Sequence, residues 1–311
     1  MKFLVTGGAG FLGSTLVNQL LELGHHVRVL DDLSAGDQSR LDTRALFTRG
    51  DTRDIPKLWT LLKGVDCVYH LAARVSVPES VLYPVEYNEV NVGGTVSLMT
   101  AVRDARVKRV VFASSGAAYG GQPVQPVRET ASLHPESPYA VSKMAAEGYV
   151  QALGALWGIE TVVLRIFNAY GPGQNIPPTH APVIPQFLKQ ILAGGSVVIY
   201  GKGEQSRDFV YLTDVVDALM AAGRAPGVDR AVINVGSGQE VTIAGLVQAI
   251  ERVTGRQAHT LRNEGDSGGV NRLVADITLA REKLEFRPKV DLETGLRRIL
   301  AEDPRFRQGK T

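Results

Sequence analysis

Short apolar runs alternate with segments of helical periodicity through the first half of the chain. Continuous apolar runs predict buried strands, and apolar residues that recur every three or four positions predict helices. The predicted strands are 2–6, 26–30, 45–49, 67–71, 109–113 and 161–167, and the predicted helices are 11–23, 55–62, 90–105 and 139–156. This alternation predicts an α/β fold, a doubly wound parallel sheet with helices on both faces.

The pattern changes after Asn168. Residues 170–185 are rich in proline and glycine, and so long a connection predicts a functional loop. We then expect strands at 197–200, 208–211 and 231–235, helices at 185–193 and 292–300, a helix capped by Thr213 that runs to Ala222, a helix from Thr242 to Gly255, and a glycine-rich loop at 265–269. This half predicts a smaller lobe over the carboxyl ends of the strands, where ligands of such sheets bind.

Composition narrows the class of protein. The 311 residues carry 34 basic and 32 acidic side chains, so a net charge of +2 suggests no nucleic-acid or membrane surface. No apolar run reaches membrane-spanning length, and no basic leader precedes the first strand. Cys67 is the single cysteine, which excludes an intrachain disulfide, and the six histidines show no metal-ligand spacing. We expect a cytoplasmic enzyme without a metal.

Gly7, Gly10 and Gly13 follow the first predicted strand at G-x-x-G-x-x-G spacing. Glycines allow a tight turn and a close approach of the backbone to a pyrophosphate. The helix that follows, beginning with Phe11 and Leu12, offers free N–H groups and a partial positive charge. The turn therefore predicts a dinucleotide site, with a turn used only for packing as the alternative.

Asp31 and Asp32 end the second strand, about 20 residues further on, as the dinucleotide motif requires. An acidic side chain there binds both ribose hydroxyls of an adenosine and repels a 2′-phosphate. The sequence thus favours NAD over NADP, with Asp31 preferred on the ribose.

Tyr139 and Lys143 lie one helical turn apart, in a helix that Ser137 and Pro138 are suited to begin. A free tyrosine, with a pKa of about 10, is a poor base near neutrality. An ammonium group one turn away is expected to lower that pKa. Tyr139 would then take a proton from a substrate hydroxyl while a hydride leaves the same carbon for NAD. The spacing alone leaves an unrelated surface pair as the alternative.

Ser114, Ser115 and Gly116 follow the predicted strand 109–113. Because strand ends face the cofactor cleft, a hydroxyl here can reach the same substrate oxygen. The alternative is a serine-rich turn that only starts a loop.

The motifs TGGAGFLG, LDDLS, GDTRD, HLAA, VNVGGT, SSGAAYG, YAVSK, RIFNAYGPGQ and RDFVYLTD occur in this order over nearly the whole chain. With them the chain resembles the extended short-chain dehydrogenases/reductases, in the branch of NAD-dependent nucleotide-sugar epimerases and dehydratases, and is most similar to UDP-glucose 4-epimerases. The resemblance implies a Rossmann-like NAD-binding domain of residues 1–167 with a returning segment at 211–235. Residues 168–210 and 236–311 would form a smaller α/β lobe that binds the nucleotide sugar.

The resemblance also implies roles for individual residues. Ser115, Tyr139 and Lys143 would form a catalytic triad. Further cofactor contacts would come from Asp51 and Thr52 beside the adenine, from Leu71, Ala72 and Ala73, from Asn91 and from Ser114. Substrate contacts would come from Asn168, from Arg207 and Arg272 on the phosphates, and from Tyr211 and the loop after Tyr170. Arg262 is an alternative to Arg272, and an internal salt bridge to Asp208 is the alternative role for Arg207.

Two departures from the family pattern bear on the reaction. Gly116 and Ala117 occupy positions where dehydratases carry an Asp-Glu pair and decarboxylases a glutamate, so elimination lacks its carboxylate. Ala117 also lacks the second hydroxyl of many 4-epimerases. Leu273 lies where the family adjusts room for an N-acetyl group, and it is neither the large tyrosine nor the small residue seen there.

The expected activity is therefore reversible 4-epimerisation of a UDP-hexose (UDP-glucose and UDP-galactose) through a 4-keto sugar, with tightly bound NAD. The alternatives are a UDP-N-acetylglucosamine or UDP-glucuronate 4-epimerase, a 4-reductase, and a non-catalytic NAD-binding regulator. The family also implies a homodimer through helices 90–105 and 139–156.

Overall fold

The main sheet is parallel and has seven strands in the order β11-β6-β5-β4-β1-β2-β3. The computed structural model describes residues 1–264 and 270–307, so the predicted glycine-rich loop at 265–269 lies outside the described residues. The strands of this sheet are β1 (Lys2–Thr6), β2 (His26–Asp31), β3 (Leu46–Arg49), β4 (Cys67–His70), β5 (Arg109–Ser115), β6 (Glu160–Ile166) and β11 (Ala231–Val235). The predicted doubly wound α/β fold is confirmed.

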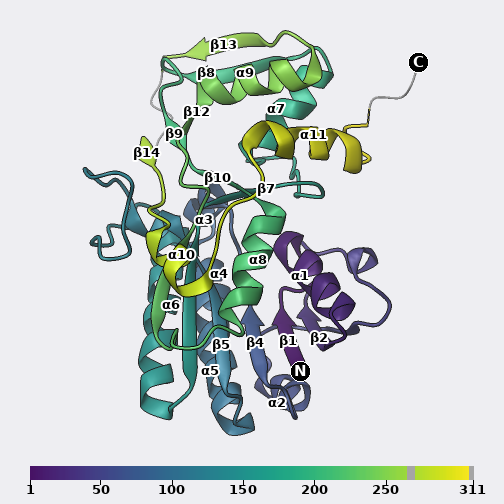
Figure 1. Ribbon diagram of the computed structural model, residues 1–311, viewed down its shortest axis with the longest axis vertical. Helices are drawn as coiled ribbons and strands as arrows, with labels where there is room; N and C mark the ends of the chain where they lie inside the picture. The colour runs from purple at the N-terminus through teal and green to yellow at the C-terminus, as the bar shows by residue number, and fades with distance from the viewer. Residues whose placement is uncertain (265–269, 308–311) are drawn as a thin grey trace.

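Helices cover both faces of the sheet (Figure 1). One face packs against α1 (Phe11–Glu22), α8 (Leu212–Ala222) and α10 (Thr278–Leu284), and the other against α2 (Ile55–Leu62), α5 (Gly94–Ala105) and α6 (Pro138–Trp157). Each face has its own cluster of buried apolar side chains, because strands covered on both faces are apolar throughout. The sheet is therefore a rigid platform whose strand ends can carry a site.

A smaller lobe stands over the carboxyl ends of the strands (Figure 1). Its elements are α7 (Val183–Leu192), α9 (Ile243–Thr254), α11 (Leu292–Glu302) and the parallel pair β8 (Ser196–Tyr200) and β13 (His259–Asn263). Two small sheets join the halves: β7 (Asn168–Tyr170) with β10 (Phe209–Tyr211), and β12 (Val241–Thr242) with β9 (Ser206–Arg207) and β14 (Arg272–Leu273). The lobe has a separate buried cluster around Phe187, Leu246 and Leu296. The exact domain boundaries given above stay a prediction.

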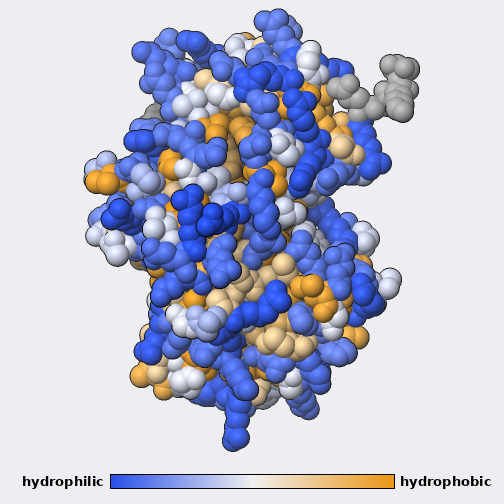
Figure 2. Space-filling view, viewed as in Figure 1, coloured by the Kyte–Doolittle hydropathy of each residue, from blue (hydrophilic) through white to orange (hydrophobic). Residues whose placement is uncertain are grey.

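The surface narrows to a waist on the right of Figure 2, between the lobe and the sheet. A pocket of about 450 Å³ lies between α1 and the segment 302–305, and Phe11, Arg40 and Gly173 help to line it.

Within residues 1–264 and 270–307, no helix is both long enough and apolar enough to cross a membrane.

The sequence missed several short elements. These are α3 (Val77–Leu82), α4 (Pro84–Tyr87), α10, the 3₁₀ turns η1 (Gln38–Arg40) and η3 (Gly116–Tyr119), and the strands β7, β9, β12, β13 and β14. The helix predicted at 90–105 begins earlier, as a π-helical segment η2 (Asn88–Gly93) that runs into α5. Most of these elements are too short for an apolar period to develop.

Helix caps show where local sequence signals hold and where they fail. Ser137 accepts a hydrogen bond from the Ala140 N–H and Pro138 opens α6, as predicted. Thr242 caps α9 in the same way. The predicted cap at Thr213 is wrong: α8 begins at Leu212, after Tyr211, so Thr213 lies inside the helix. The strand β10 leads directly into α8, which leaves no room for a separate cap residue.

This difference gives a direct test. Thr242→Ala removes the acceptor for the Gly245 N–H, 3.0 Å away, and should lower the free energy of unfolding by about 1 kcal/mol. Thr213→Ala, the matched control, should change it by less than about 0.5 kcal/mol, because alanine suits a helix interior. Urea unfolding measures both, and equal losses would contradict the assigned caps.

Candidate active site

The glycine turn after β1 is packed too closely for side chains. Gly7 has φ of +69°, and a Cβ there would lie 2.6 Å from the Ala72 backbone nitrogen. A Cβ on Gly13 would overlap the Gly7 carbonyl oxygen. The turn therefore lies against the end of β4 and brings the first N–H groups of α1 close to the sheet edge. This cradle fits a dinucleotide pyrophosphate.

Asp31, predicted to hold the adenosine ribose, is buried at the end of β2. Its carboxylate accepts hydrogen bonds from the N–H groups of Ala9 and Leu33, both at 2.9 Å. Burial raises the pKa of Asp31, and these backbone donors act in the opposite direction. The carboxylate thus also fixes the glycine turn, while the neighbouring Asp32 is exposed and accepts from Ser34.

The other predicted cofactor contacts lie at neighbouring strand ends. Leu71, Ala72 and Ala73 directly follow β4, beside the glycine turn. The Asp51 carboxylate binds the Arg53 guanidinium, at 2.6 Å from Nη2. The Thr52 side chain is buried, and a Cβ on Gly94 of α5 would overlap its hydroxyl. An adenine contact from Thr52 would therefore use its backbone.

Asn91 lies in the π-helical segment and binds protein on three sides. Its amide oxygen accepts from the Arg74 N–H (2.8 Å), and its amide nitrogen donates to the Arg74 carbonyl (3.0 Å) and the Ser142 hydroxyl (2.9 Å). Both amide hydrogens are thereby used. Asn91 thus ties the segment after β4 to α6, a role that the sequence did not indicate.

Ser115, Tyr139 and Lys143 come together at the end of β5, as predicted. The Lys143 ammonium is buried, donates to the Ala113 carbonyl at 2.8 Å and lies 5.1 Å from the centre of the Phe112 ring. The Ser115 oxygen accepts from the Ala117 N–H at 3.1 Å. Since that bond occupies an acceptor site, the Ser115 hydrogen is available for an oxygen in front of it.

The expectation that Lys143 lowers the pKa of Tyr139 is not what the structure shows. Burial raises the pKa of Tyr139, and a hydrogen bond with Ser115 acts in the opposite direction. Burial also lowers the pKa of Lys143 to about 7, so its charge is itself disfavoured. The lysine points at the Ala113 carbonyl, and the apolar surroundings oppose charge on both groups.

The Ser114 side chain points toward α6. Its hydroxyl donates to Glu147 at 2.9 Å, so a cofactor contact would have to come from its backbone. Glu147 in turn binds Arg165 on β6. Sequence reasoning missed both charged residues. The available signals were a glutamate one turn after Lys143 and an arginine inside an apolar strand.

Asn168 and Arg207 lie where the two small sheets meet. The Asn168 amide donates to the Asp208 carbonyl at 3.1 Å. Arg207 donates to the Ser206 carbonyl at 2.8 Å, and burial lowers its pKa. Asp208 accepts instead from the backbone of Ser237, so the alternative salt bridge to Arg207 does not form. Arg207 forms no ion pair with a carboxylate of the described residues, which suits an anion site.

Arg272 of β14 is paired with Ser206 of β9, one position before Arg207, and the Arg272 and Ser206 side chains both bind Glu240. The Arg272 guanidinium binds the Glu240 carboxylate through two hydrogen bonds, at 2.7 and 2.6 Å. Arg262, the alternative, lies on β13 in a different sheet. The choice between Arg272 and Arg262 stays a prediction, and a phosphate at Arg272 would have to share its guanidinium with Glu240.

Tyr211 lies in the core of the lobe. It is 2% exposed, and its ring centre is 5.4 Å from that of Tyr170 and 5.5 Å from the Arg298 guanidinium carbon. The structure therefore makes Tyr211 a packing residue and does not place its ring on the cleft.

The fold and this site define a nucleotide-binding α/β protein with a tyrosine and a lysine at a strand end. The model of the NAD dependent epimerase/dehydratase family matches residues 3–236. The chain belongs to this family.

Individual relatives match over nearly the whole chain. The UDP-glucose 4-epimerase of Mycolicibacterium smegmatis is 38% identical over 95% of this chain and 96% of its own. The structure of UDP-glucose 4-epimerase from Thermotoga maritima with UDP-glucose has a TM-score of 0.92 at 37% identity and covers 96% of this chain and 97% of its own. A UDP-N-acetylglucosamine 4-epimerase from Methanobrevibacter ruminantium, in complex with UDP-N-acetylmuramic acid, has a TM-score of 0.91 at 36% identity and covers 96% of both chains.

The lowered pKa of Lys143 predicts a stability that depends on pH. Between its folded pKa of about 7 and its ordinary value of 10.5, the unfolded chain binds the proton and the folded chain does not. The free energy of unfolding contributed by Lys143 therefore rises with pH in this window and is constant below it.

Lys143→Met should remove this rise. Between pH 6 and pH 9 the free energy of unfolding of the wild type should rise by more than about 1 kcal/mol relative to that of the variant. Urea unfolding at each pH measures both. Lys189→Met, at an exposed lysine of α7, is the control and should track the wild type. Parallel curves for Lys143→Met and the wild type would contradict the buried ammonium.

Proposed function

We propose that the protein interconverts UDP-glucose and UDP-galactose by epimerisation at C4, with NAD retained through the cycle. The observation that carries this proposal is the group of Ser115, Tyr139 and Lys143 at the end of β5. Gly116 and Ala117 supply no carboxylate beside it. Proton transfer at one carbon is therefore supported, and elimination of a neighbouring group is not.

Tyr139 acts as the base that removes the proton of the 4-hydroxyl group. Ser115 accepts from the Ala117 N–H and so directs its own hydrogen toward the oxygens of Tyr139 and the sugar. When bound, NAD supplies the acceptor that takes the C4 hydride and returns it to the other face of the sugar, as well as a positive charge that favours the phenolate. Loss of the hydroxyl proton and the C4 hydride leaves a 4-keto sugar, and return of the hydride to the opposite face of C4 with return of the proton to the oxygen gives the epimer.

The cofactor would be held by residues that the structure brings to one edge. Gly7, Gly10 and Gly13 with the start of α1 would hold the pyrophosphate, and Asp31 the adenosine ribose. Lys143 would reach the nicotinamide ribose from the Ala113 side. An acidic residue at the end of β2 favours NAD over NADP.

The sugar has to turn over while the nucleotide stays in place. Asn168, Arg207 and Arg272 lie on the two small sheets and would anchor the diphosphate. Gly116 packs against the Phe167 ring, since a Cβ there would be 3.1 Å from it. An anchor at the nucleotide end alone would leave the 4-keto sugar free to rotate.

A second candidate is the epimerisation of UDP-N-acetylglucosamine. Leu273, at the position where the family adjusts room for an N-acetyl group, is 6% exposed and packs in the main core. A side chain turned into the core does not fill the sugar site. The Methanobrevibacter ruminantium enzyme, named for this substrate, matches the fold as well as the UDP-glucose enzyme does.

Purified protein incubated with UDP-glucose alone should form UDP-galactose. Chromatography of the reaction mixture measures this conversion. Tyr139→Phe should lower kcat by about 10³-fold, because general acid–base catalysis contributes at that scale. Its matched control, Tyr200→Phe, changes an exposed tyrosine of β8 and should keep full activity. UDP-N-acetylglucosamine and UDP-glucuronate tested in parallel rank the substrates. If the purified protein converts none of these UDP-sugars without added cofactor, the proposed epimerase activity is refuted.

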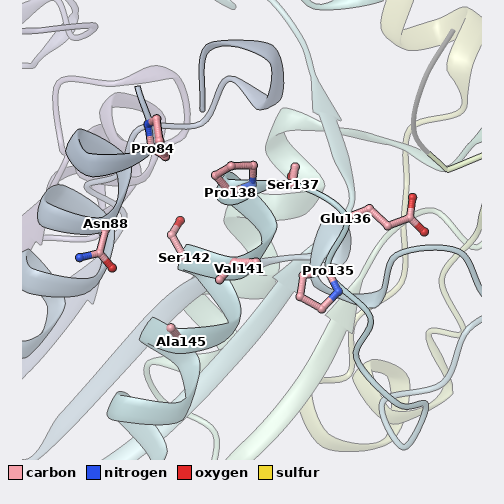
Figure 3. Close-up of a pocket in the computed structure, with 9 residues that line it drawn as sticks. All are labelled: Pro84, Asn88, Pro135, Glu136, Ser137, Pro138, Val141, Ser142 and Ala145. Carbon is pink, nitrogen blue, oxygen red and sulfur yellow. The ribbon is translucent and has the colours of Figure 1, made fainter. Parts of the chain in front are cut away.

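We also propose a homodimer in which α6 is part of the interface. Exposed apolar side chains gather on α3, α4 and the outer side of α6: Val77, Val81, Leu82, Val85, Val141 and Tyr149. Figure 3 shows the groove between them, of about 500 Å³, with Val141 and Ala145 of α6 across from Pro84 and Asn88. An apolar surface of this kind favours a protein partner, and the family implies a second copy.

Light scattering should give twice the 33.5 kDa mass of one chain. Val85→Glu with Val141→Glu should shift the protein toward the monomer, because both charges would be buried against the second copy. Leu261→Glu, at an exposed apolar residue of β13, should leave the dimer intact. A monomeric wild type would refute this interface.

We place the reaction in the cytoplasm, where NAD and UDP-sugars are supplied. A buried free thiol at Cys67 is compatible with a reducing compartment. Cell fractionation with the epimerase activity as marker tests this location.

A further inference from the structure

Glu147 and Arg165 form a buried ion pair that the proposed chemistry does not use. Their side chains are 7% and 6% exposed, and Arg165 Nε lies 3.1 Å from Glu147 Oε2. Removing two charges from water is costly, so such a pair is weak evidence for stability. Its position next to the site suggests a different purpose.

The pair extends into a polar network across four elements. Arg165 donates to the Tyr119 hydroxyl at 2.8 Å, and its guanidinium carbon lies 4.7 Å from the centre of that ring. The Tyr119 hydroxyl donates to the Asn234 amide oxygen at 2.7 Å. The pair is thereby fixed by η3, which follows Ser115, and by β11 at the edge of the sheet.

Ser114 connects this network to the site. Its hydroxyl donates to Glu147 at 2.9 Å, while Lys143, one turn earlier on α6, donates to the Ala113 carbonyl at 2.8 Å. Two consecutive residues of β5 thus bind two side chains one turn apart on α6. Together these bonds fix both the rotation of the helix and its position along the strand.

We propose that Glu147, held by Arg165, is a positioning residue that sets α6 against β5 so that Tyr139 meets Ser115. The residue on β5 after Ser114 is Ser115, and Tyr139 is two turns before Glu147 on α6. A slip of the helix along the strand would therefore separate the phenol from the serine hydroxyl. This inference rests on the proposed function, in which Tyr139 and Ser115 act on one substrate oxygen.

Ser114→Ala is the mildest test, since it removes one hydroxyl and keeps the ion pair. It should lower kcat about tenfold with KM within twofold of the wild type and an unchanged melting temperature. The acidic limb of the kcat–pH profile should move to higher pH, because Tyr139 loses the help of a well-placed Ser115. Ser114→Thr restores the hydroxyl and should recover most of kcat.

Glu147→Gln tests the pair itself, and the chain offers a matched control. Arg109 on β5 and Glu160 on β6 form an ion pair with Nη2 and Oε2 2.7 Å apart, at the opposite end of the two strands that carry Ser114 and Arg165. Glu160→Gln should leave kcat and its pH profile unchanged per folded molecule, whereas Glu147→Gln should lower kcat at least tenfold and move the acidic limb in the same direction. If Glu147→Gln does not fold, the two Ser114 variants decide.

A readout without substrate separates this inference from the proposed function. The difference in ultraviolet absorbance between a protein and the same protein with Tyr139→Phe, followed as the pH is raised, reports ionisation of Tyr139 alone. The midpoint pH of this titration should rise in Ser114→Ala and should not change in Glu160→Gln. If the wild type converts no UDP-sugar, the proposed function fails while this titration still tests the positioning. Unchanged titration and unchanged kcat in Ser114→Ala would overturn the inference.

Discussion

The packing of α6 against the end of β5 is the contact on which the rest of the site depends. One helix face presents Tyr139 and Lys143 to the strand, and each meets a group on β5 that holds it in place. The opposite face of the same helix carries the apolar groove that we assign to a second copy. Because a single helix carries both surfaces, a dimer formed through the groove would also hold α6 in place against β5.

Burial of the contact between α6 and β5 excludes water from Tyr139 and Lys143, and it also disfavours the charged forms of both side chains. The pKa of Lys143 is lowered to about 7, and that of Tyr139 is raised, so the apolar surroundings favour a neutral pair. A site of this kind keeps its proton on Tyr139 until a further positive charge is present. Tight binding of a cationic cofactor would then have a direct chemical effect on Tyr139, since the positive charge would make the phenol acidic enough to act. The contribution of Lys143 to lowering the pKa of Tyr139 is therefore smaller than its spacing predicts, and the cofactor charge would have to contribute more.

The sequence predicts the parts of this structure that depend on long, regular patterns. The strands of the main sheet and the longer helices that cover it follow from apolar periodicity, and Ser137 and Thr242 are predicted correctly as caps. Short elements such as β9 and β14 depend on pairing with distant residues, so no local pattern predicts them. The hydrogen bonds of Ser114 and Asn91 are set by the direction of a side chain, and spacing along the chain does not contain that information. The motifs thus predict where these residues lie, and they do not predict the hydrogen bonds that the two side chains make within the protein.

The substrate side of the cleft is fixed by a carboxylate that binds backbone. Asp208 is buried and accepts from the N–H groups of Ser237, Gly238 and Ala275, at 2.6, 3.0 and 3.1 Å. It thereby joins β9, the end of β11 and the segment after β14 directly beside Arg207. A guanidinium on so well connected a backbone can hold a diphosphate without moving with it. That rigidity is what an epimerase needs at the nucleotide end, because the sugar can present both faces to one base only if its anchor stays still.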